Sequence, residues 1–138
     1  MPRVQITRVL HFNAAHRLFR PDWSDEKNRE VFGPCSNPNW HGHNYEIEVT
    51  VSGEIDPDTG FVLDLKTLAE LVADRLIDDL DHKNLNREVA WLSGVNPTTE
   101  NLVVAMWNRL GPVLPDGVEL TRLVLQETPR NRAEYSGG

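Results

Sequence analysis

The chain has 138 residues, of which 39% are hydrophobic and 25% are charged, enough for one domain with a hydrophobic core and too few for two. Its formal charge of −7 argues against a general nucleic-acid binder, and no apolar run is long enough to cross a bilayer. The N-terminus lacks a signal-peptide pattern, and the single cysteine, Cys35, leaves no internal disulfide. We therefore expect one cytoplasmic domain over residues 1–138 that binds neither nucleic acid nor membrane.

Two strands are expected in the first half of the chain. Residues 4–15 are rich in β-branched and apolar side chains. From Tyr45 to Val51, apolar residues alternate with polar ones, which predicts a half-buried antiparallel strand. Between the two strands, the segment from Ser24 to Lys27 has the pattern of a helix start, and Gly33-Pro34 would end that short helix.

The second half predicts two longer helices and two strands. Asp64 is placed to cap a helix with an apolar stripe that runs to Leu80, and Thr98 opens a helix that Gly111-Pro112 ends. Strands are expected over 118–128 and near 132–135. The order β-β-α-α-β-β predicts an α+β fold, a four-stranded antiparallel sheet with two helices packed on one face. Oligomerisation is one way to cover its exposed edges.

Three histidines are candidate metal ligands. His41 and His43 lie at the start of the second strand and project from the same face because side chains alternate along a strand. His16, at the end of the first strand, is the candidate third ligand. Three imidazoles with one open position are typical of catalytic zinc, whereas structural zinc usually has four protein ligands. The spacing alone does not show that the two strands are neighbours, so ordinary surface histidines stay the alternative.

A thiol and a carboxylate–imidazole couple could carry proton transfer. Cys35 lies in a polar loop six residues before His41. A thiol near a metal or an imidazole ionises more easily and serves as base or nucleophile, although many lone cysteines are inert and buried. Asp81-His82 either relays protons or is only the charged C-terminus of a helix.

Glu127 is a candidate ligand-binding carboxylate. It continues the alternation of Leu123 and Leu125, so it would end a largely apolar face, where a carboxylate needs a partner. Arginine or the 2-amino-pyrimidinone edge of a pterin could pair with it bidentately. An exposed glutamate at a strand end is the alternative. Glu100, in the first helical turn after Thr98-Thr99, is explained most simply by the helix dipole.

Several motifs together resemble the 6-pyruvoyltetrahydropterin synthase family, from about Thr7 to Tyr135. His16 resembles the family's first zinc ligand, and Gln126-Glu127-Thr128 resembles its pterin-anchoring segment. The other motifs, in chain order, are Cys35-x5-His41-Gly42-His43-Asn44-Tyr45, Gly53-Glu54-Ile55-Asp56-Pro57-x-Thr59-Gly60, Leu80-Asp81-His82-Lys83-Asn84-Leu85 and Thr98-Thr99-Glu100-Asn101.

The resemblance implies a T-fold, with trimers whose sheets join into a barrel and two trimers stacked as a homohexamer. It implies a lyase that converts 7,8-dihydroneopterin triphosphate to 6-pyruvoyltetrahydropterin with loss of triphosphate. The implied roles are Zn²⁺ binding by His16, His41 and His43, and general base for Cys35, assisted by Asp81 and His82 of a neighbouring subunit. Glu127 would anchor the pterin ring, with Thr98, Thr99 and Glu100 nearby.

Two other functions stay open. The first is 6-carboxytetrahydropterin synthase, which acts on the same substrate in queuosine and deazapurine biosynthesis. Its cysteine usually stands closer to His-Gly-His, whereas Ser36 to Trp40 intervene here, which favours the pyruvoyl enzyme. The second is a non-catalytic zinc- and pterin-binding oligomeric module, against which the retained Cys35 and Asp81-His82 argue. Trp40, where the family often has a small residue, and Trp23 depart from the family pattern near the site.

Overall fold

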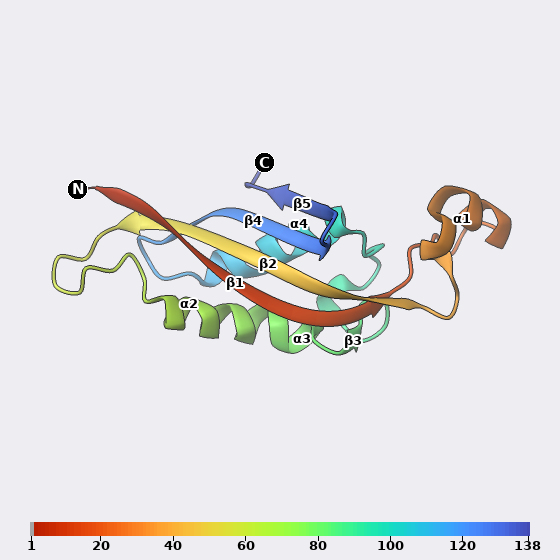
Figure 1. Cartoon of the computed structure of the whole chain (residues 1–138), viewed down its shortest axis with the longest axis horizontal. Coiled ribbons are helices and arrows are strands. Elements are labelled where there is room, and N and C mark those ends of the chain that lie inside the picture. The colour runs from red at the N-terminus through yellow and green to blue at the C-terminus, as the bar shows by residue number, and fades with distance from the viewer. Residues whose placement is uncertain (1) are drawn as a thin grey trace.

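The computed structural model describes residues 2–138, which form one twisted sheet with helices against it (Figure 1). The strands are β1 (Arg3–His16), β2 (His41–Glu54), β3 (Lys83–Asn84), β4 (Glu119–Thr128) and β5 (Asn131–Tyr135). The helices are α1 (Asp25–Phe32), α2 (Leu65–Val72), α3 (Asp78–Leu80) and α4 (Thr99–Leu110), and a single wider turn, Ala73–Ile77, joins α2 to α3. No helix of residues 2–138 is long and apolar enough to span a membrane.

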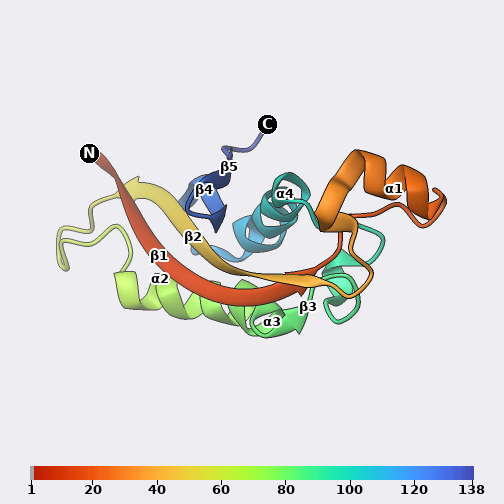
Figure 2. The ribbon, with the colours of Figure 1, turned by 45° about the vertical axis from the view of Figure 1, so that its right-hand side comes forward.

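The sheet has five strands in the order β3-β1-β2-β4-β5, and it is mixed. β1 and β2 pair antiparallel from Arg3↔Glu54 to His16↔His41, and β4 and β5 extend the antiparallel part. The fifth strand, β3, pairs parallel with β1. Figure 2 shows β1 and β2 running side by side along the whole sheet, with α1 projecting beyond the end at which β1 finishes.

The predicted four-stranded antiparallel sheet was therefore wrong in one strand. β3 has two residues, and backbone bonds hold it to β1: the Leu85 amide donates to the Ala15 carbonyl over 2.8 Å. A strand made only by backbone pairing needs no alternation of apolar residues, so its sequence has no strand pattern. The short helix expected after Ser24 exists as α1 and lies between β1 and β2, so the order β-β-α-α-β-β also omitted one helix.

The hydrophobic core lies between the sheet and α2, α3 and α4. The predicted alternation in β2 is confirmed, because Tyr45, Ile47, Val49 and Val51 are all buried. The helix stripes meet this face, although Leu65, at the start of the first stripe, is exposed. Each large side chain buried in this way contributes about 1.5–3 kcal/mol. From the helices the core includes Leu68, Val72, Leu76, Leu80, Leu102, Val103, Met106 and Leu110.

Each predicted helix start has its capping side chain. The Ser24 hydroxyl accepts a hydrogen bond from the Lys27 amide over 3.1 Å, and the Asp64 carboxylate accepts one from Lys66 over 3.3 Å. Thr98 accepts from the Asn101 amide over 3.1 Å and so sets the first residue of α4. These caps satisfy amides that have no partner inside the helix.

The backbone packs closely around Gly53, near the end of β2. A Cβ atom there would lie 2.9 Å from the Gly117 carbonyl oxygen and 3.0 Å from Val62 Cγ1. We therefore expect Gly53→Ala to lower the free energy of unfolding by about 1–3 kcal/mol, measured by urea denaturation. In the control Gly111→Ala, the nearest atom would be 4.0 Å away, so stability should change by less than about 0.5 kcal/mol. Equal stability of the two variants would contradict this packing.

Candidate metal centre and active site

The three candidate ligands meet because of the register between β1 and β2. His16 pairs directly with His41 across the two strands, and His43 follows two residues later on the same face. One ligand atom from each ring lies within 4.8 Å of the others, and the ring centroids are 4.5–5.0 Å apart. The prediction that these histidines come together is confirmed.

The ring nitrogens of this cluster fit a metal ion. His16 is fully buried and donates from Nδ1 to the Pro97 carbonyl over 2.8 Å, since that oxygen can only accept. This bond leaves His16 Nε2 as the free ligand atom. His16 Nε2, both ring nitrogens of His41, and His43 Nε2 are buried without a hydrogen-bond partner. Buried polar atoms normally have partners, and a metal ion would supply one.

Burial also favours the protonation state that a metal ligand needs. It lowers the pKa of His16 to about 4, and the neighbouring His41 and His43 lower it further. Burial, followed by the charge of His43, also lowers the pKa of His41. Both rings are therefore neutral near pH 7, with a lone pair available for a cation. Three imidazoles with an open position suit zinc.

A carboxylate completes one side of the histidine cluster. Glu127 Oε1 lies 3.3 Å from His43 Nε2, in contact but without hydrogen-bond geometry. Its other oxygen, Oε2, accepts a hydrogen bond from the Thr99 hydroxyl over 2.5 Å. The strand phase therefore predicted the inward direction of Glu127 correctly, and the bond from Thr99 ties the end of β4 to the start of α4.

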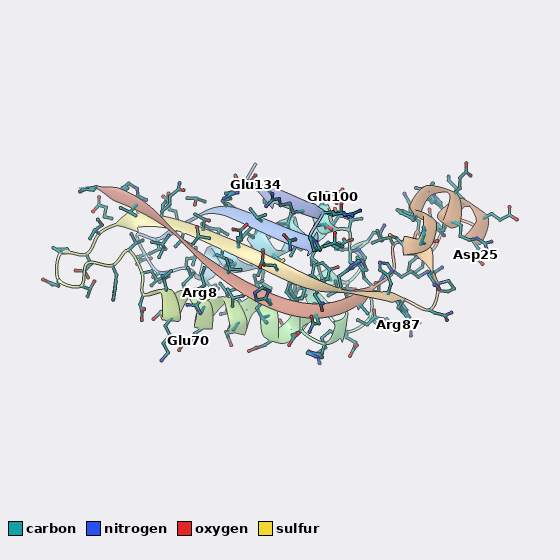
Figure 3. The ribbon with its side chains drawn as sticks, in the orientation of Figure 1. Arg8, Asp25, Glu70, Arg87, Glu100 and Glu134 are labelled. Atoms are coloured by element: carbon teal, nitrogen blue, oxygen red, sulfur yellow. The ribbon has the colours of Figure 1, made fainter. Side chains whose placement is uncertain are left out.

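The other two predicted residues at the start of α4 lie differently from Thr99. The Thr98 hydroxyl caps the helix, and Glu100 is exposed at the surface (Figure 3). Among residues 2–138, Glu100 has no ion-pair partner. Of the three, only Thr99 contacts Glu127, and roles for Thr98 and Glu100 in ligand binding stay predictions.

Cys35 lies in the turn Gly33–Ser36, held close to the end of β1. Its carbonyl accepts a hydrogen bond from the Leu18 amide over 2.8 Å, two residues after His16. The thiol is partly buried, and burial raises its pKa, as does the negative charge of Glu127. Without added positive charge, this thiol therefore stays protonated at neutral pH.

Asp81 and His82 form a couple at a different place in the subunit. Asp81 accepts a hydrogen bond from the Asn13 amide over 2.8 Å, which is the main reason that its pKa is lowered. Its second oxygen lies 3.0 Å from His82 Nδ1, and the His82 ring is largely exposed. Within the described chain, no hydrogen bond or ion pair joins this couple to Cys35 or to the histidine cluster.

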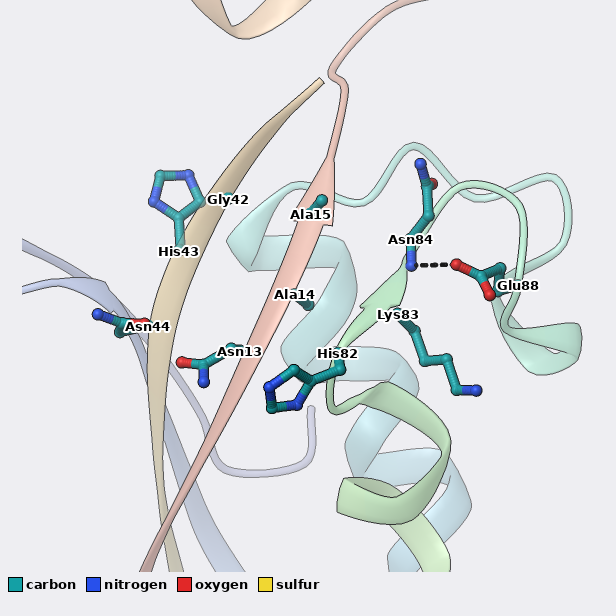
Figure 4. Close-up of a pocket in the computed structure, with 10 residues that line it drawn as sticks. All are labelled: Asn13, Ala14, Ala15, Gly42, His43, Asn44, His82, Lys83, Asn84 and Glu88. Atoms are coloured by element: carbon teal, nitrogen blue, oxygen red, sulfur yellow. Dashed lines mark hydrogen bonds between the residues drawn. The ribbon is translucent and has the colours of Figure 1, made fainter. Parts of the chain in front are cut away.

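The His82 ring lines an open cleft of about 470 Å³ that runs over β1, β2 and β3 (Figure 4). In Figure 4 it lies beside β1, and the His43 ring, which lines the same cleft, lies next to β2 on the side away from β1. Asn13 and Asn44, which pair across the two strands, also line this cleft and have the opposite phase to Ala14 and Tyr45 of the core. His43 and the buried Ala14 line it as well, so the cleft includes one residue of the histidine cluster although its asparagines face away from the core.

Comparison with known proteins identifies the family. A model of 6-pyruvoyl tetrahydropterin synthase matches residues 5–138. The chain belongs to this family. The 6-pyruvoyl tetrahydrobiopterin synthases of Pongo abelii and Homo sapiens are 47% and 45% identical to it, over 98% of this chain and 92% of each relative. The structure of Caenorhabditis elegans 6-pyruvoyl tetrahydropterin synthase superposes with a TM-score of 0.92 at 39% identity, covering 100% of this chain and 98% of that one.

Two groups that support the histidine cluster were not among the residues predicted from the sequence. The Tyr45 hydroxyl lies 3.3 Å from His16 Nδ1, and its ring stacks on Phe12 with centroids 4.7 Å apart. Burial raises the pKa of this hydroxyl, so Tyr45 stays neutral. Its strand phase, shared with His43, could have indicated this position. The Pro97 carbonyl has no such signal, because a backbone acceptor carries no residue type.

Removing one ligand tests the metal centre. We expect His41→Ala to weaken zinc binding by roughly 100-fold or more, because two imidazoles remain where three converge. Zinc content after equilibrium dialysis, measured by plasma mass spectrometry, checks this. The control His11→Ala removes an exposed imidazole whose nearest carboxylate is Glu46 at 3.8 Å, and it should keep the metal content of the wild type. Full zinc content in His41→Ala would show that His41 is not a ligand.

Proposed function

We propose that this chain converts 7,8-dihydroneopterin triphosphate to 6-pyruvoyltetrahydropterin with loss of triphosphate, as a zinc-dependent lyase. The observation that carries the proposal is the cluster of three imidazoles, each with a buried ring nitrogen that has no hydrogen-bond partner, next to the Glu127 carboxylate. Identities of 45–47% to curated 6-pyruvoyl tetrahydrobiopterin synthases support the same activity. We place the protein in the cytoplasm.

His16, His41 and His43 would hold Zn²⁺. The bound dication would polarise the side-chain oxygens of the substrate and make neighbouring C–H and O–H groups more acidic. The hydrogen bond from His16 Nδ1 to the Pro97 carbonyl orients His16 Nε2 for metal binding. The Tyr45 hydroxyl beside that bond helps to keep the ring in place.

Glu127 would anchor the pterin ring. The 2-amino-pyrimidinone edge presents two parallel N–H donors, and a carboxylate accepts such a pair bidentately. The hydrogen bond from Thr99 holds the carboxylate plane and uses only part of the acceptor capacity of Oε2. Thr98 and Glu100, beside Thr99 at the start of α4, complete the proposed binding residues.

Cys35 would act as the general base. A thiol accepts a proton only as thiolate, and positive charge nearby favours that form. Its pKa in the metal-loaded site is therefore lower than in the protein without metal, where burial and Glu127 raise it. Asp81 and His82 would assist, with the carboxylate holding one tautomer of the imidazole through the 3.0 Å contact.

Assembly would bring that couple to the thiol. We place Asp81 and His82 in the site of a neighbouring subunit, because within residues 2–138 no hydrogen bond or ion pair joins them to Cys35 or to the histidine cluster. β5 lies at one edge of the sheet, and β3 covers only two residues of β1 at the other. Uncovered edges favour pairing with another chain. We propose a T-fold trimer with its sheets joined in a barrel, and two such trimers stacked as a hexamer.

Product analysis by mass spectrometry tests the reaction. We expect zinc-loaded protein and 7,8-dihydroneopterin triphosphate to give 6-pyruvoyltetrahydropterin and free triphosphate. In the variant Cys35→Ala, turnover should fall by about 10²–10⁴-fold while zinc content stays unchanged, because only the proposed base is removed. A carboxy product with acetaldehyde would assign the protein to deazapurine biosynthesis. Unreacted substrate would leave a pterin-binding module, and normal turnover by Cys35→Ala would exclude Cys35 as the base.

Subunit mixing tests whether the site is shared. Cys35→Ala and His82→Ala subunits should each be nearly inactive, and hybrid oligomers of the two should recover about a quarter of wild-type activity. That fraction follows if each site takes its thiol and its imidazole from adjacent subunits at random. Native mass spectrometry verifies mixing. Hybrids without recovered activity would indicate that each site is complete within one subunit.

A further inference from the structure

A second cleft lies beyond the end of β1 and the start of β2. It measures about 760 Å³, within the usual range for small-molecule sites, and its lining residues are Phe32 and members of the segments 17–22, 38–40 and 86–96. Three arginines line it, namely Arg17, Arg20 and Arg87. Figure 3 labels Arg87 at the end of the sheet where β1 finishes. In a chain with a formal charge of −7, this gathering of guanidinium groups needs an explanation.

Two of the three guanidinium groups have no counter-charge. Arg20 pairs with both oxygens of Asp22 at 3.0 Å, and this partner lowers the pKa of the Asp22 carboxyl, so the pair is neutral overall. Within residues 2–138, no carboxylate lies at ion-pair distance from Arg17 or Arg87. The cleft therefore has a net positive charge, which favours an anion.

Aromatic rings hold both unpaired guanidinium groups. Arg17 lies over the Phe19 ring at 3.9 Å and donates from Nε to the Ser36 carbonyl over 2.8 Å. Arg87 lies over the Trp40 ring at 4.8 Å. Stacking uses the flat face of a guanidinium and leaves N–H groups at its edge, the arrangement that binds phosphate oxygens in pairs.

Hydrogen bonds make the cleft rigid before any ligand binds. Asn86 accepts from the Arg17 amide over 2.9 Å and donates to the Arg17 carbonyl over 2.8 Å. Asn96 accepts from the Phe19 amide over 3.2 Å. These bonds fix the loop after β3 to the chain that leaves β1. A preformed site loses less conformational entropy when it binds a ligand.

The cleft adjoins the histidine cluster along two chain segments. Arg17 follows His16 and Trp40 precedes His41, so their Cα atoms are each about 3.8 Å from that of a ligand. Trp40 also has a φ of 69°, in the left-handed region that bulky residues rarely adopt. Such backbone strain concentrates at functional sites, and here it places the indole under Arg87.

We propose that this cleft binds a chain of phosphates, with Arg17 and Arg87 as its anion contacts and Trp40 as the platform for Arg87. Resting on the proposed function, we assign it to the triphosphate end of the substrate. A triphosphate is long, flexible and strongly charged, and it would extend from the metal centre into an open, positively charged and rigid groove. The Trp40–Arg87 pair would then help to set the preference for a phosphorylated substrate.

Titration with inorganic tripolyphosphate tests the cleft, followed by calorimetry and by tryptophan fluorescence. Protein with and without zinc is titrated, because tripolyphosphate itself binds divalent cations. We expect Arg87→Ala to weaken binding roughly tenfold in both forms, and Arg87→Lys to weaken it less, since lysine keeps the charge but lacks the planar fork. Arg87 is exposed, so the variants should fold normally, as thermal unfolding checks. Trp40→Phe should remove most of the fluorescence change and identify its source.

Arg29→Ala is the matched control, because it removes an exposed arginine from α1 outside the cleft. Its tripolyphosphate affinity and its KM should equal those of the wild type. For Arg87→Ala, we expect KM for the substrate to rise roughly tenfold while kcat stays within about twofold, as for a contact made equally in ground and transition states. Unchanged affinity for tripolyphosphate in Arg87→Ala would overturn the cleft as a phosphate site.

The remaining outcomes separate this inference from the proposed function. Weaker tripolyphosphate binding with unchanged KM would overturn the assignment to the substrate and leave a site for a separate phosphorylated ligand. Arg87-dependent binding by a protein that never turns over the pterin would refute the proposed function and keep the phosphate site. Normal turnover of the pterin, with tripolyphosphate binding and KM both unchanged in Arg87→Ala, would support the proposed function and refute the phosphate site.

Discussion

The antiparallel register of β1 and β2 is the constraint on which the site depends. It pairs His16 with His41, residues that are far apart in the chain, and it sets His43 on the same face. Because side chains alternate along a strand, a slip of one residue would turn His41 and His43 away from His16. The same register buries Tyr45, Ile47 and Val49 against the helices. One pairing therefore fixes the core and the candidate metal ligands together.

The histidine cluster lies at the end of an apolar face, and its physical chemistry follows from that position. Desolvation lowers the pKa of His16 and raises that of Cys35, so both groups favour their neutral forms in the protein without metal. Several buried ring nitrogens have no partner, which is an unfavourable arrangement for the fold alone. A bound cation would satisfy the imidazoles and favour the thiolate. The site is thus arranged for a positive charge that the polypeptide does not supply.

Polar groups of different function are distributed over different sides of the subunit. The histidine cluster, Glu127 and Thr99 lie at the end of the core face, whereas the exposed His82 ring lines a cleft together with Asn13, Asn44 and His43. The cleft lined by Arg17 and Arg87 continues from the ends of β1 and β2. The proposed active site combines the first two groups from neighbouring subunits, and the proposed phosphate cleft would extend it toward the charged end of the substrate.

Local patterns in the sequence determined most helix and strand positions and the direction of one candidate site residue. The alternation around Tyr45 predicted β2, the capping residues Asp64 and Thr98 predicted two helix starts, and the phase of Glu127 predicted its inward direction, because these signals depend on neighbours in the chain. Tertiary structure alone decided the rest. β3 exists only because its backbone meets the edge of β1, and the Pro97 carbonyl orients His16 without any residue-type signal. The stacking of Arg87 on Trp40 likewise joins two loops that lie far apart in the sequence, and their contact depends on long-range packing that local periodicity does not encode.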